Sequence, residues 1–251
     1  MQDIHRTIPA TLAALTAALF TLCVFPMSAS SQEDPDGEAR GGGFFQGGYM
    51  QLDLSELNAA LTAAGYPALG EDFATLGGGG FGMKGRFLLG GEGHALIGSD
   101  ETTADGATQL ELGGGYGLFR VGYLAYTLEG LDVYPMIGIG GGGMSLSLVD
   151  RSAPTFGEVL TDPRRSSKLS IASFLLDASV AAHYRFAIEE ATPEPAEDDE
   201  PGGVLVGVQV GYTFAPGSSS WNLDAINTVA GGPDLAMEGF YVRITIGGWG
   251  G

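Results

Sequence analysis

Apolar and polar residues alternate with a period of two from Leu169 to Ile188. One set of alternate positions is apolar throughout, whereas the other mixes aliphatic residues with polar and charged ones such as Asp177, His183 and Arg185. This pattern predicts a β-strand with one face in an apolar medium and the other in a polar one. Such a strand would be about 65 Å long and, tilted at ~40°, would rise about 50 Å, roughly twice the height of the apolar band of an outer-membrane barrel. We therefore expect this strand to cross a membrane and project beyond it.

Seven further stretches have strand patterns of the same kind. Tight turns at Lys84-Gly85-Arg86 and at Glu129-Gly130 join neighbouring stretches as antiparallel pairs. The alternation becomes irregular near Phe119, which indicates either one bent strand with a bulge or a break into two strands. The seven stretches are Gly43–Asp53, Leu76–Lys84, Phe87–Gly98, Thr108–Leu128, Asp132–Leu148, Val204–Phe214 and Gly239–Trp249.

One short helix is expected between the first two strands. Leu54, Leu57, Leu61 and Ala64 would share a face, Asp53 or Ser55 would cap its start, and Gly65 would end it. We expect this helix to pack over one end of the domain. The sequence thus predicts an all-β fold: an eight-stranded antiparallel up-and-down transmembrane β-barrel with one short helix in a loop. Closure is required because a bilayer offers no water to an open sheet edge.

The N-terminal residues have the composition of a secretory leader. An apolar run from Ile8 to Phe25 is followed by small residues up to Ser30, which predicts a signal peptide over residues 1–30. Residues 31–42 are predicted to be a flexible acidic arm, and residues 43–250 to be the barrel domain. Cys23, the single cysteine, lies in the leader, so we expect neither a disulfide nor a thiolate site in the mature chain.

The overall charge excludes one class of partner. The net charge is −19, from 11 basic and 30 acidic residues, so we expect no binding to nucleic acid through a basic surface. Only 16% of the residues are charged and 43 are glycine, a composition that fits neither a disordered acidic chain nor an ordinary soluble domain.

Two strands carry a resemblance to a known class of protein. The terminal strand Gly239–Trp249 has an apolar face and a late aromatic residue, and the strand Val208–Phe214 ends in Gly-Tyr-Thr-Phe. Over residues 43–249 this pattern resembles small outer-membrane β-barrel proteins of the OmpA and OmpX type. The resemblance implies a location in the outer membrane and carries over no functional residue. The chain departs from such barrels by continuing past Trp249 to Gly250-Gly251.

Motifs for catalysis or cofactor binding are few. Gly138, Gly140 and Gly143 have the spacing of a dinucleotide fingerprint, but an alternating strand pattern follows them, so they are interpreted as strand glycines. His94 and His183, the histidines of the mature chain, fall on the inward phase of their strands. The acidic run from Glu189 to Glu200 lacks the spacing of a calcium loop and is interpreted as a solvated connection. We expect no cofactor and no metal.

Charged residues on the inward phase suggest a network in the barrel lumen. Because a buried ion without a partner is costly, opposite charges are expected to pair there. In particular, Arg243 is expected to bridge to Glu92 or Glu111 and to help close the barrel. The predicted network consists of Glu92, Glu111, Asp177, Arg185 and Arg243.

A second group of charges falls in a predicted loop. Arg151, Arg164, Arg165 and Lys168 could contact lipopolysaccharide phosphates if this loop faces outward. The alternative is an ordinary solvated loop.

These patterns favour a non-catalytic outer-membrane barrel with a side-chain-filled lumen and a structural or surface-interaction role. Its expected partners are outer-membrane lipid and lipopolysaccharide, and we expect a monomer. One alternative is a soluble exported barrel of the lipocalin type that holds an apolar ligand, which would require the opposite face of every strand to be wet. Another is a lipid hydrolase at the barrel rim, which would require His94 or His183 to lie beside a serine and an acid.

Overall fold

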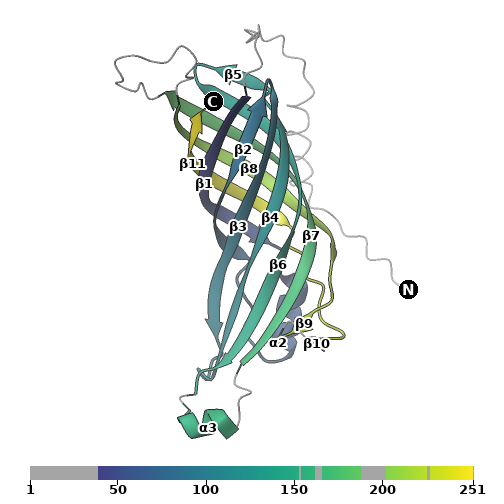
Figure 1. Cartoon of the computed structure of the whole chain (residues 1–251). Coiled ribbons are helices and arrows are strands. Elements are labelled where there is room, and N and C mark those ends of the chain that lie inside the picture. Colours follow the sequence, from purple (N-terminus) through teal and green to yellow (C-terminus); the bar gives the residue numbers. More distant parts are fainter. Residues whose placement is uncertain (1–38, 153, 162–165, 188–201, 225–226, 251) are drawn as a thin grey trace, which may run out of the picture. The chain divides into compact units, whose positions relative to one another are not determined.

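The computed structural model describes residues 39–152, 154–161, 166–187, 202–224 and 227–250. Eight long strands pair with their neighbours in antiparallel register, and pairing of the first with the last closes them into a barrel (Figure 1). This confirms the predicted fold, in which closure removes the free edges of the sheet. The strands are β1 (Ala39–Leu52), β2 (Asp72–Lys84), β3 (Phe87–Thr102), β4 (Thr108–Tyr123), β6 (Leu131–Asp150), β7 (Ser166–Ala187), β8 (Gly203–Ser218) and β11 (Gly239–Gly250).

Shorter elements lie in the connections. They are the strands β5 (Tyr126–Leu128), β9 (Asn222–Leu223) and β10 (Asn227–Thr228) and the helices α2 (Ser55–Ala63) and α3 (Phe156–Thr161). The stretch 108–128 is broken into β4 and β5, and the register shift lies instead in the pairing of β3 with β4, between Ile97 and Asp100. Both predicted tight turns are present, with left-handed backbone at Gly85 (φ 57°) and Glu129 (φ 46°).

The first strand begins earlier than its sequence indicated. Residues 39–42 were expected to belong to a flexible arm, but they form the start of β1. Ala39 pairs with Lys84 of β2, and Gly41 pairs with Gly250 of β11. The barrel therefore supplies a hydrogen-bonding strand on each side, which these residues lack in isolation. The predicted leader, the rest of the predicted arm and the acidic connection 189–200 lie outside the described residues.

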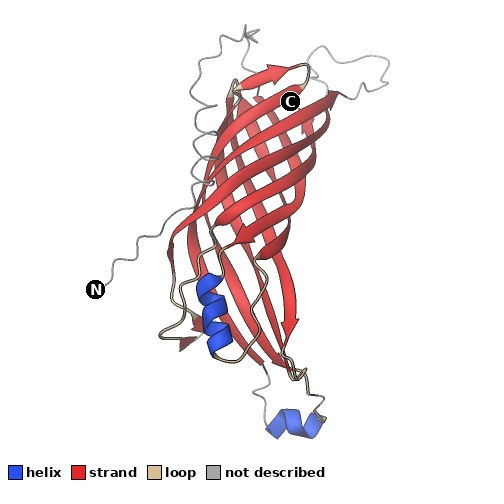
Figure 2. Cartoon of the chain, turned by 180° about the vertical axis from the view of Figure 1, so that it is seen from behind, coloured by secondary structure: helices blue, strands red, loops and turns tan. Residues whose placement is uncertain are grey.

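The two ends of the barrel differ. At one end, here called the terminal end, β1 starts, β11 finishes, and tight turns follow β2 and β5. The opposite end, here called the far end, carries α2, α3, β9 and β10 (Figures 1 and 2).

Hydrophobic residues change sides along the strands, as β4 shows most clearly. Near the terminal end Phe119 and Val121 are exposed on the outer face while Arg120 points inward and is buried. Towards the far end Leu110 is buried inside and Glu111 is exposed outside. The even-numbered residues of β4 face inward along its whole length. The alternation of side-chain direction is therefore unbroken, but the apolar residues lie on the outer face near the terminal end and on the inner face towards the far end.

This inversion corrects part of the sequence interpretation. The apolar face of β4 at Leu110 and Leu112 was assumed to be the outer one, which placed Glu111 inside. At the far end the barrel instead has an apolar interior and a polar exterior, as in a soluble protein. Met144 and Leu146 of β6 likewise point into this interior, with the small polar Ser145 and Ser147 between them on the outside.

The far-end interior is filled by one hydrophobic cluster. It joins inward side chains of the strands to Leu57 and Leu61 of α2 and to Trp221, Leu235 and Met237 of the connection between β8 and β11. The predicted helix is thus confirmed, and Gly65 is in left-handed conformation (φ 86°) after its end. The predicted cap is not: the N-cap is Leu54, no side chain caps it, and the Asp53 carboxylate accepts the Ser55 N–H (3.0 Å) just before the helix. Ala64, expected on the apolar face, is exposed. None of the helices that the structure describes has the length and apolar character of a membrane-spanning helix.

The packing of α2 gives a first prediction. Leu57→Ala should lower the free energy of unfolding by about 2 to 4 kcal/mol, because it opens a cavity where Leu57 is 3% exposed. The matched control is Leu160→Ala in α3, where the leucine is 68% exposed and the expected change is within about 0.5 kcal/mol. Chemical denaturation in detergent micelles measures both, and equal effects of the two substitutions would show that α2 does not belong to the core.

Candidate functional site

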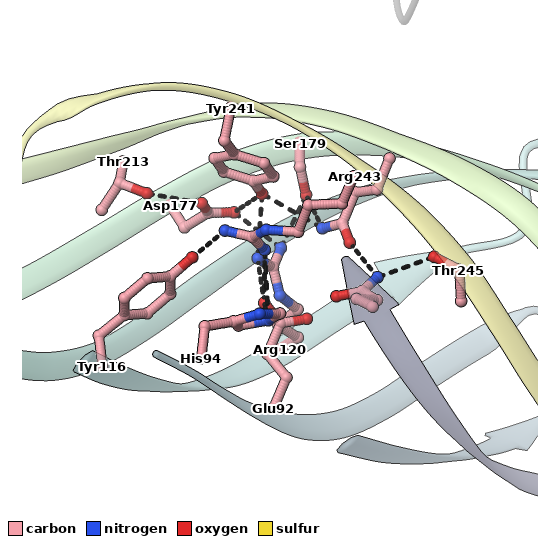
Figure 3. A network of polar contacts seen from close by, with 12 residues as sticks. Glu92, His94, Tyr116, Arg120, Asp177, Ser179, Thr213, Tyr241, Arg243 and Thr245 are labelled. Atoms are coloured by element: carbon pink, nitrogen blue, oxygen red, sulfur yellow. Dashed lines mark hydrogen bonds and ion pairs between the residues drawn. The ribbon is translucent and has the colours of Figure 1, made fainter. Parts of the chain in front are cut away.

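A network of buried polar side chains crosses the lumen between the far-end cluster and the terminal end (Figure 3). Its charged members come from the inward-facing positions of β3, β4, β7 and β11, strands that are distributed around the barrel. These charged residues are Glu92, Arg120, Asp177 and Arg243, whose exposed fractions are 8%, 3%, 4% and 0%.

Arg120 is the centre of this network. Its Nη1 donates to Asp177 Oδ1 and to Ser179 Oγ, both at 2.7 Å. Its Nη2 donates to Glu92 Oε1 at 2.8 Å and to the Tyr241 hydroxyl at 3.0 Å. One guanidinium group therefore connects carboxylates on β3 and β7 with a phenol on β11, and charge-assisted bonds of this kind are the strongest that side chains form.

Arg243 approaches the same carboxylate from another wall. Its Nη1 lies 3.0 Å from Glu92 Oε1, and its Nη2 donates to the Tyr116 hydroxyl. The guanidinium carbon also lies 3.7 Å from the centroid of the Tyr241 ring, a cation–π contact within the same strand. The final strand is thus tied across the lumen to β3 and β4.

The charges of the network balance. Two guanidinium groups face the carboxylates of Glu92 and Asp177, so the formal charges of these four groups cancel. His94 places Nε2 at 3.1 Å from Glu92 Oε1 and stacks its ring on Tyr116 with centroids 5.3 Å apart. Charge balance matters because an uncompensated ion in such surroundings costs several kcal/mol.

Neutral side chains of β1, β8 and β11 extend the network. Thr213 donates to Asp177 Oδ2 (3.2 Å), and the Gln46 amide contacts Gln209 (2.7 Å) and Thr245 (2.9 Å). Rotating the Gln209 amide by 180° directs its oxygen at Arg120, with Nη1 at 3.1 Å, and its nitrogen at the Gln46 amide, which must then rotate as well so that its oxygen accepts from Gln209. We assign this orientation because the amide oxygen then accepts from the guanidinium.

Glycines on the inward phase make room for these large groups. A Cβ at Gly48 would lie 2.9 Å from Arg243 Cγ, and one at Gly138 would lie 3.2 Å from Asp177 Cβ. The glycine-rich strands therefore fit close to the arginines and carboxylates that cross the lumen.

A separate ion pair lies nearer the terminal end. Arg185 Nε is 2.6 Å from Asp132 Oδ2, and the Tyr134 hydroxyl donates to the same oxygen at 3.0 Å. The Arg185 guanidinium also lies over the Trp249 ring, 5.2 Å from its centroid. Trp249, the late aromatic of the final strand, therefore packs at the lumen mouth beside Arg185.

The structure brings together three of the five residues expected in the lumen network, namely Glu92, Asp177 and Arg243. Arg185 is inward but pairs with Asp132 instead. Glu111 is exposed on the outer face of β4, next to Asp100 and Ser147 on the adjacent strands, so its expected place in the lumen is wrong. The reason is the inversion of hydrophobicity along β4 described above.

Sequence analysis missed Arg120, the residue with the most partners. Its signal was available, because Arg120 shares the even phase of β4 with Leu118 and Leu112. An arginine on that phase identifies it as the lumen side, whereas the leucines alone suggested the lipid side. Asp132, the partner of Arg185, was likewise missed because the β6 pattern is apolar on both faces in that region.

The predicted surface cations are not part of the network. Arg151 and Lys168 are exposed at the far end, and Arg164 and Arg165 lie outside the described residues. Of the two inward histidines, His94 joins the network and His183 lies beside Tyr134, with ring centroids 5.6 Å apart. Within the described ranges, no group of three or more His, Cys, Asp or Glu side chains is arranged to hold a metal ion.

Comparisons with protein-family models and with curated proteins give no match to this chain. The polar groups of the network bind one another across the lumen and occupy its width, so the geometry indicates that they connect the strands on different sides of the barrel. We call this set of contacts the brace.

A double-mutant cycle tests the brace. Arg243→Met and Glu92→Gln should each lower the free energy of unfolding, Arg243→Met by about 3 to 5 kcal/mol, because each leaves a buried charge with one partner fewer. The double variant should recover part of the combined loss. Urea unfolding in detergent measures the cycle.

The matched control for this cycle is Glu111→Gln, which removes an exposed carboxylate from the neighbouring strand. It should change stability by no more than about 0.5 kcal/mol and show no coupling to Arg243→Met. Additive effects of Arg243→Met and Glu92→Gln would contradict the brace.

Proposed function

We propose that this protein is an outer-membrane β-barrel with a side-chain-filled lumen, and that its role is structural or surface-interacting and non-catalytic. The observation that carries the proposal is the polarity of the region from the terminal end to the middle of the barrel, where an exposed apolar outer face surrounds buried charges. An apolar exterior around a polar interior is the arrangement that lipid requires.

The outer apolar face involves every long strand. The side chains involved are 37–79% exposed, and an aqueous surface seldom carries so many together. They include Phe45 of β1, Leu76 of β2, Leu89 and Ile97 of β3, Phe119 and Val121 of β4, Ile137 and Ile139 of β6, Phe174 and Leu176 of β7, Val204, Val206 and Val208 of β8, and Ile244 and Ile246 of β11. A lipocalin-type barrel would bury these residues around its ligand.

Aromatic pairs mark two levels of this outer face. Phe87 packs on Tyr123 and Tyr184 on Phe186 near the terminal end, with ring centroids 5.5 and 4.7 Å apart. Tyr212 packs on Phe214 towards the far end of β8, with centroids 4.6 Å apart. Aromatic side chains at the two boundaries of an apolar band are typical of barrels in the outer membrane.

The interior supports a role other than transport or catalysis. The ion network and the far-end cluster occupy the lumen in succession, as expected for an eight-stranded barrel whose interior just accommodates its own side chains. The His94 Nε2 faces Glu92 Oε1 at 3.1 Å, so His94 is engaged by a carboxylate, whereas a hydrolytic histidine would face a serine nucleophile. The far end, with its loops and α3, is then the region available for surface interactions.

Membrane insertion is the first test of this proposal. The full-length protein, expressed in a Gram-negative host, should fractionate with the outer membrane, resist carbonate extraction and need detergent for solubility. The short turns at Lys84–Arg86 and Glu129–Leu131 should face the periplasm. Full recovery in the soluble fraction without detergent would overturn the location.

Conductance is the second test. Purified protein in a planar bilayer should give no stable single-channel steps, because the paired charges and the apolar cluster leave no continuous water path. A large-pore porin inserted under the same conditions is the positive control. Stable steps from this chain would contradict the filled lumen and favour a transport role.

A further inference from the structure

A groove of about 670 Å³ lies on the outer wall of the barrel where β6 and β7 meet the connection after β8. Its volume falls in the range of small-molecule sites, about 300 to 1,000 Å³. Small residues, among them Gly143 and Ala172, leave this wall hollow. Its polar lining consists of Ser145, Lys168, Ser170, Ser219, Asn222 and Asp224.

Strand pairing places the polar residues of the groove beside one another on adjacent strands. Ser170 of β7 pairs with Ser145 of β6 on one side and with Asn222 of β9 on the other. On the β9 side, the Asp224 N–H donates to the Lys168 carbonyl oxygen at 2.8 Å. The groove is therefore built on hydrogen-bonded backbone, which holds its functional groups at fixed spacing.

Ser145 has an unused hydroxyl in this groove. Its Oγ is buried and has no hydrogen-bond partner in the described structure. A buried hydroxyl without a partner costs free energy, and rotation of the Ser145 side chain into the groove would let a ligand hydroxyl or amide satisfy it.

The groove begins where the outer apolar face ends. Phe174, two residues along β7 from the groove residue Ala172, is 48% exposed and belongs to that face. Beyond Ala172 towards the far end, the outward positions of β7 are Ser170 and Lys168. In a membrane-inserted barrel, the groove would lie at the level of lipid headgroups.

The hydrogen-bond donors and acceptors that line the groove indicate which class of ligand fits it. Serine and asparagine both donate and accept hydrogen bonds, lysine only donates, and aspartate only accepts. Asp224 follows β9 directly and lies beside Lys168, to which its backbone N–H is bonded, so the carboxylate opposes binding of an isolated phosphate. Sugar hydroxyls, which donate and accept, match this mixed lining.

We propose that this groove binds the sugar headgroup of a glycolipid in the surrounding leaflet. The inference rests on the proposed membrane location and names the lipid class that contacts this wall. It shifts the expected contact of Lys168 from phosphate to a polyhydroxylated ring, because Asp224 shares the site.

The test uses the full chain folded in C8E4 micelles, a detergent without sugar, with monogalactosyl diacylglycerol and phosphatidylglycerol as separate probes. Native mass spectrometry should show that the galactolipid is retained and the phospholipid is not. Ser170→Trp, which fills the groove, should weaken retention about tenfold or more. The matched control, Gln51→Trp on an exposed outward position of β1, should leave it unchanged.

Two milder variants keep the result independent of folding defects. Asn222→Ala should weaken galactolipid retention, and Asp224→Asn should weaken it while strengthening retention of phosphatidylglycerol. Equal or better retention of phosphatidylglycerol by the unmodified chain, or no retention of the galactolipid, would overturn the inference. Because micelle binding does not require insertion in a cell envelope, a failure here is distinct from a failure of membrane fractionation.

Discussion

The ion network across the lumen is the constraint that the remaining structure must satisfy. Arg120 and Arg243 can be buried because Glu92 and Asp177 meet them from other strands. A shift of one residue in the pairing of any of these strands would turn a charge outward and leave its partner alone inside. The network therefore ties the closed barrel together and disfavours alternative registers. It also makes the interior around it polar, so the apolar residues of these strands face outward.

This polar interior explains the apolar outer face and the change of polarity along the strands. Around the network the hydrophobic side chains have no interior position, so they face outward, where lipid would cover them in the proposed membrane location. At the far end α2 and the connection between β8 and β11 cover the interior, and the same strands bury leucine and methionine inside. The same eight strands thus place their hydrophobic side chains outward around the network, an arrangement suited to lipid, and inward at the far end, an arrangement suited to water.

Because side chains fill the lumen, a ligand or partner would bind on the outer surface of the barrel. The groove at Ser145 and Ser170 lies where the two regimes meet, so its ligand would touch polar groups and lipid chains together. Beyond the groove, at the far end, α3 exposes Phe156 and Leu160. These surfaces are built by loops and by the small outward residues of β6 and β7, whereas the network supplies the rigid frame.

The sequence by itself predicted the eight long strands, because a period of two, as in β3, β7, β8 and β11, is a local property that survives without a tertiary context. It did not predict the short strands β5, β9 and β10. It also placed Glu92, Asp177 and Arg243 on one side of their strands. Which side is the lumen was decided correctly wherever a single face stayed apolar along a strand. In β4 it was wrong for Glu111, because the apolar residues change sides halfway while the geometry continues.

The partners of each charge required the tertiary structure. Arg120 lies 57 residues from Asp177 and Arg243 lies 151 residues from Glu92, and such pairs depend on closure and register, which no local pattern encodes. The start of β1 at Ala39 was likewise decided by β2 and β11, which supply its hydrogen bonds. Local alternation thus specifies which stretches form strands, and barrel closure specifies which side chains contact one another.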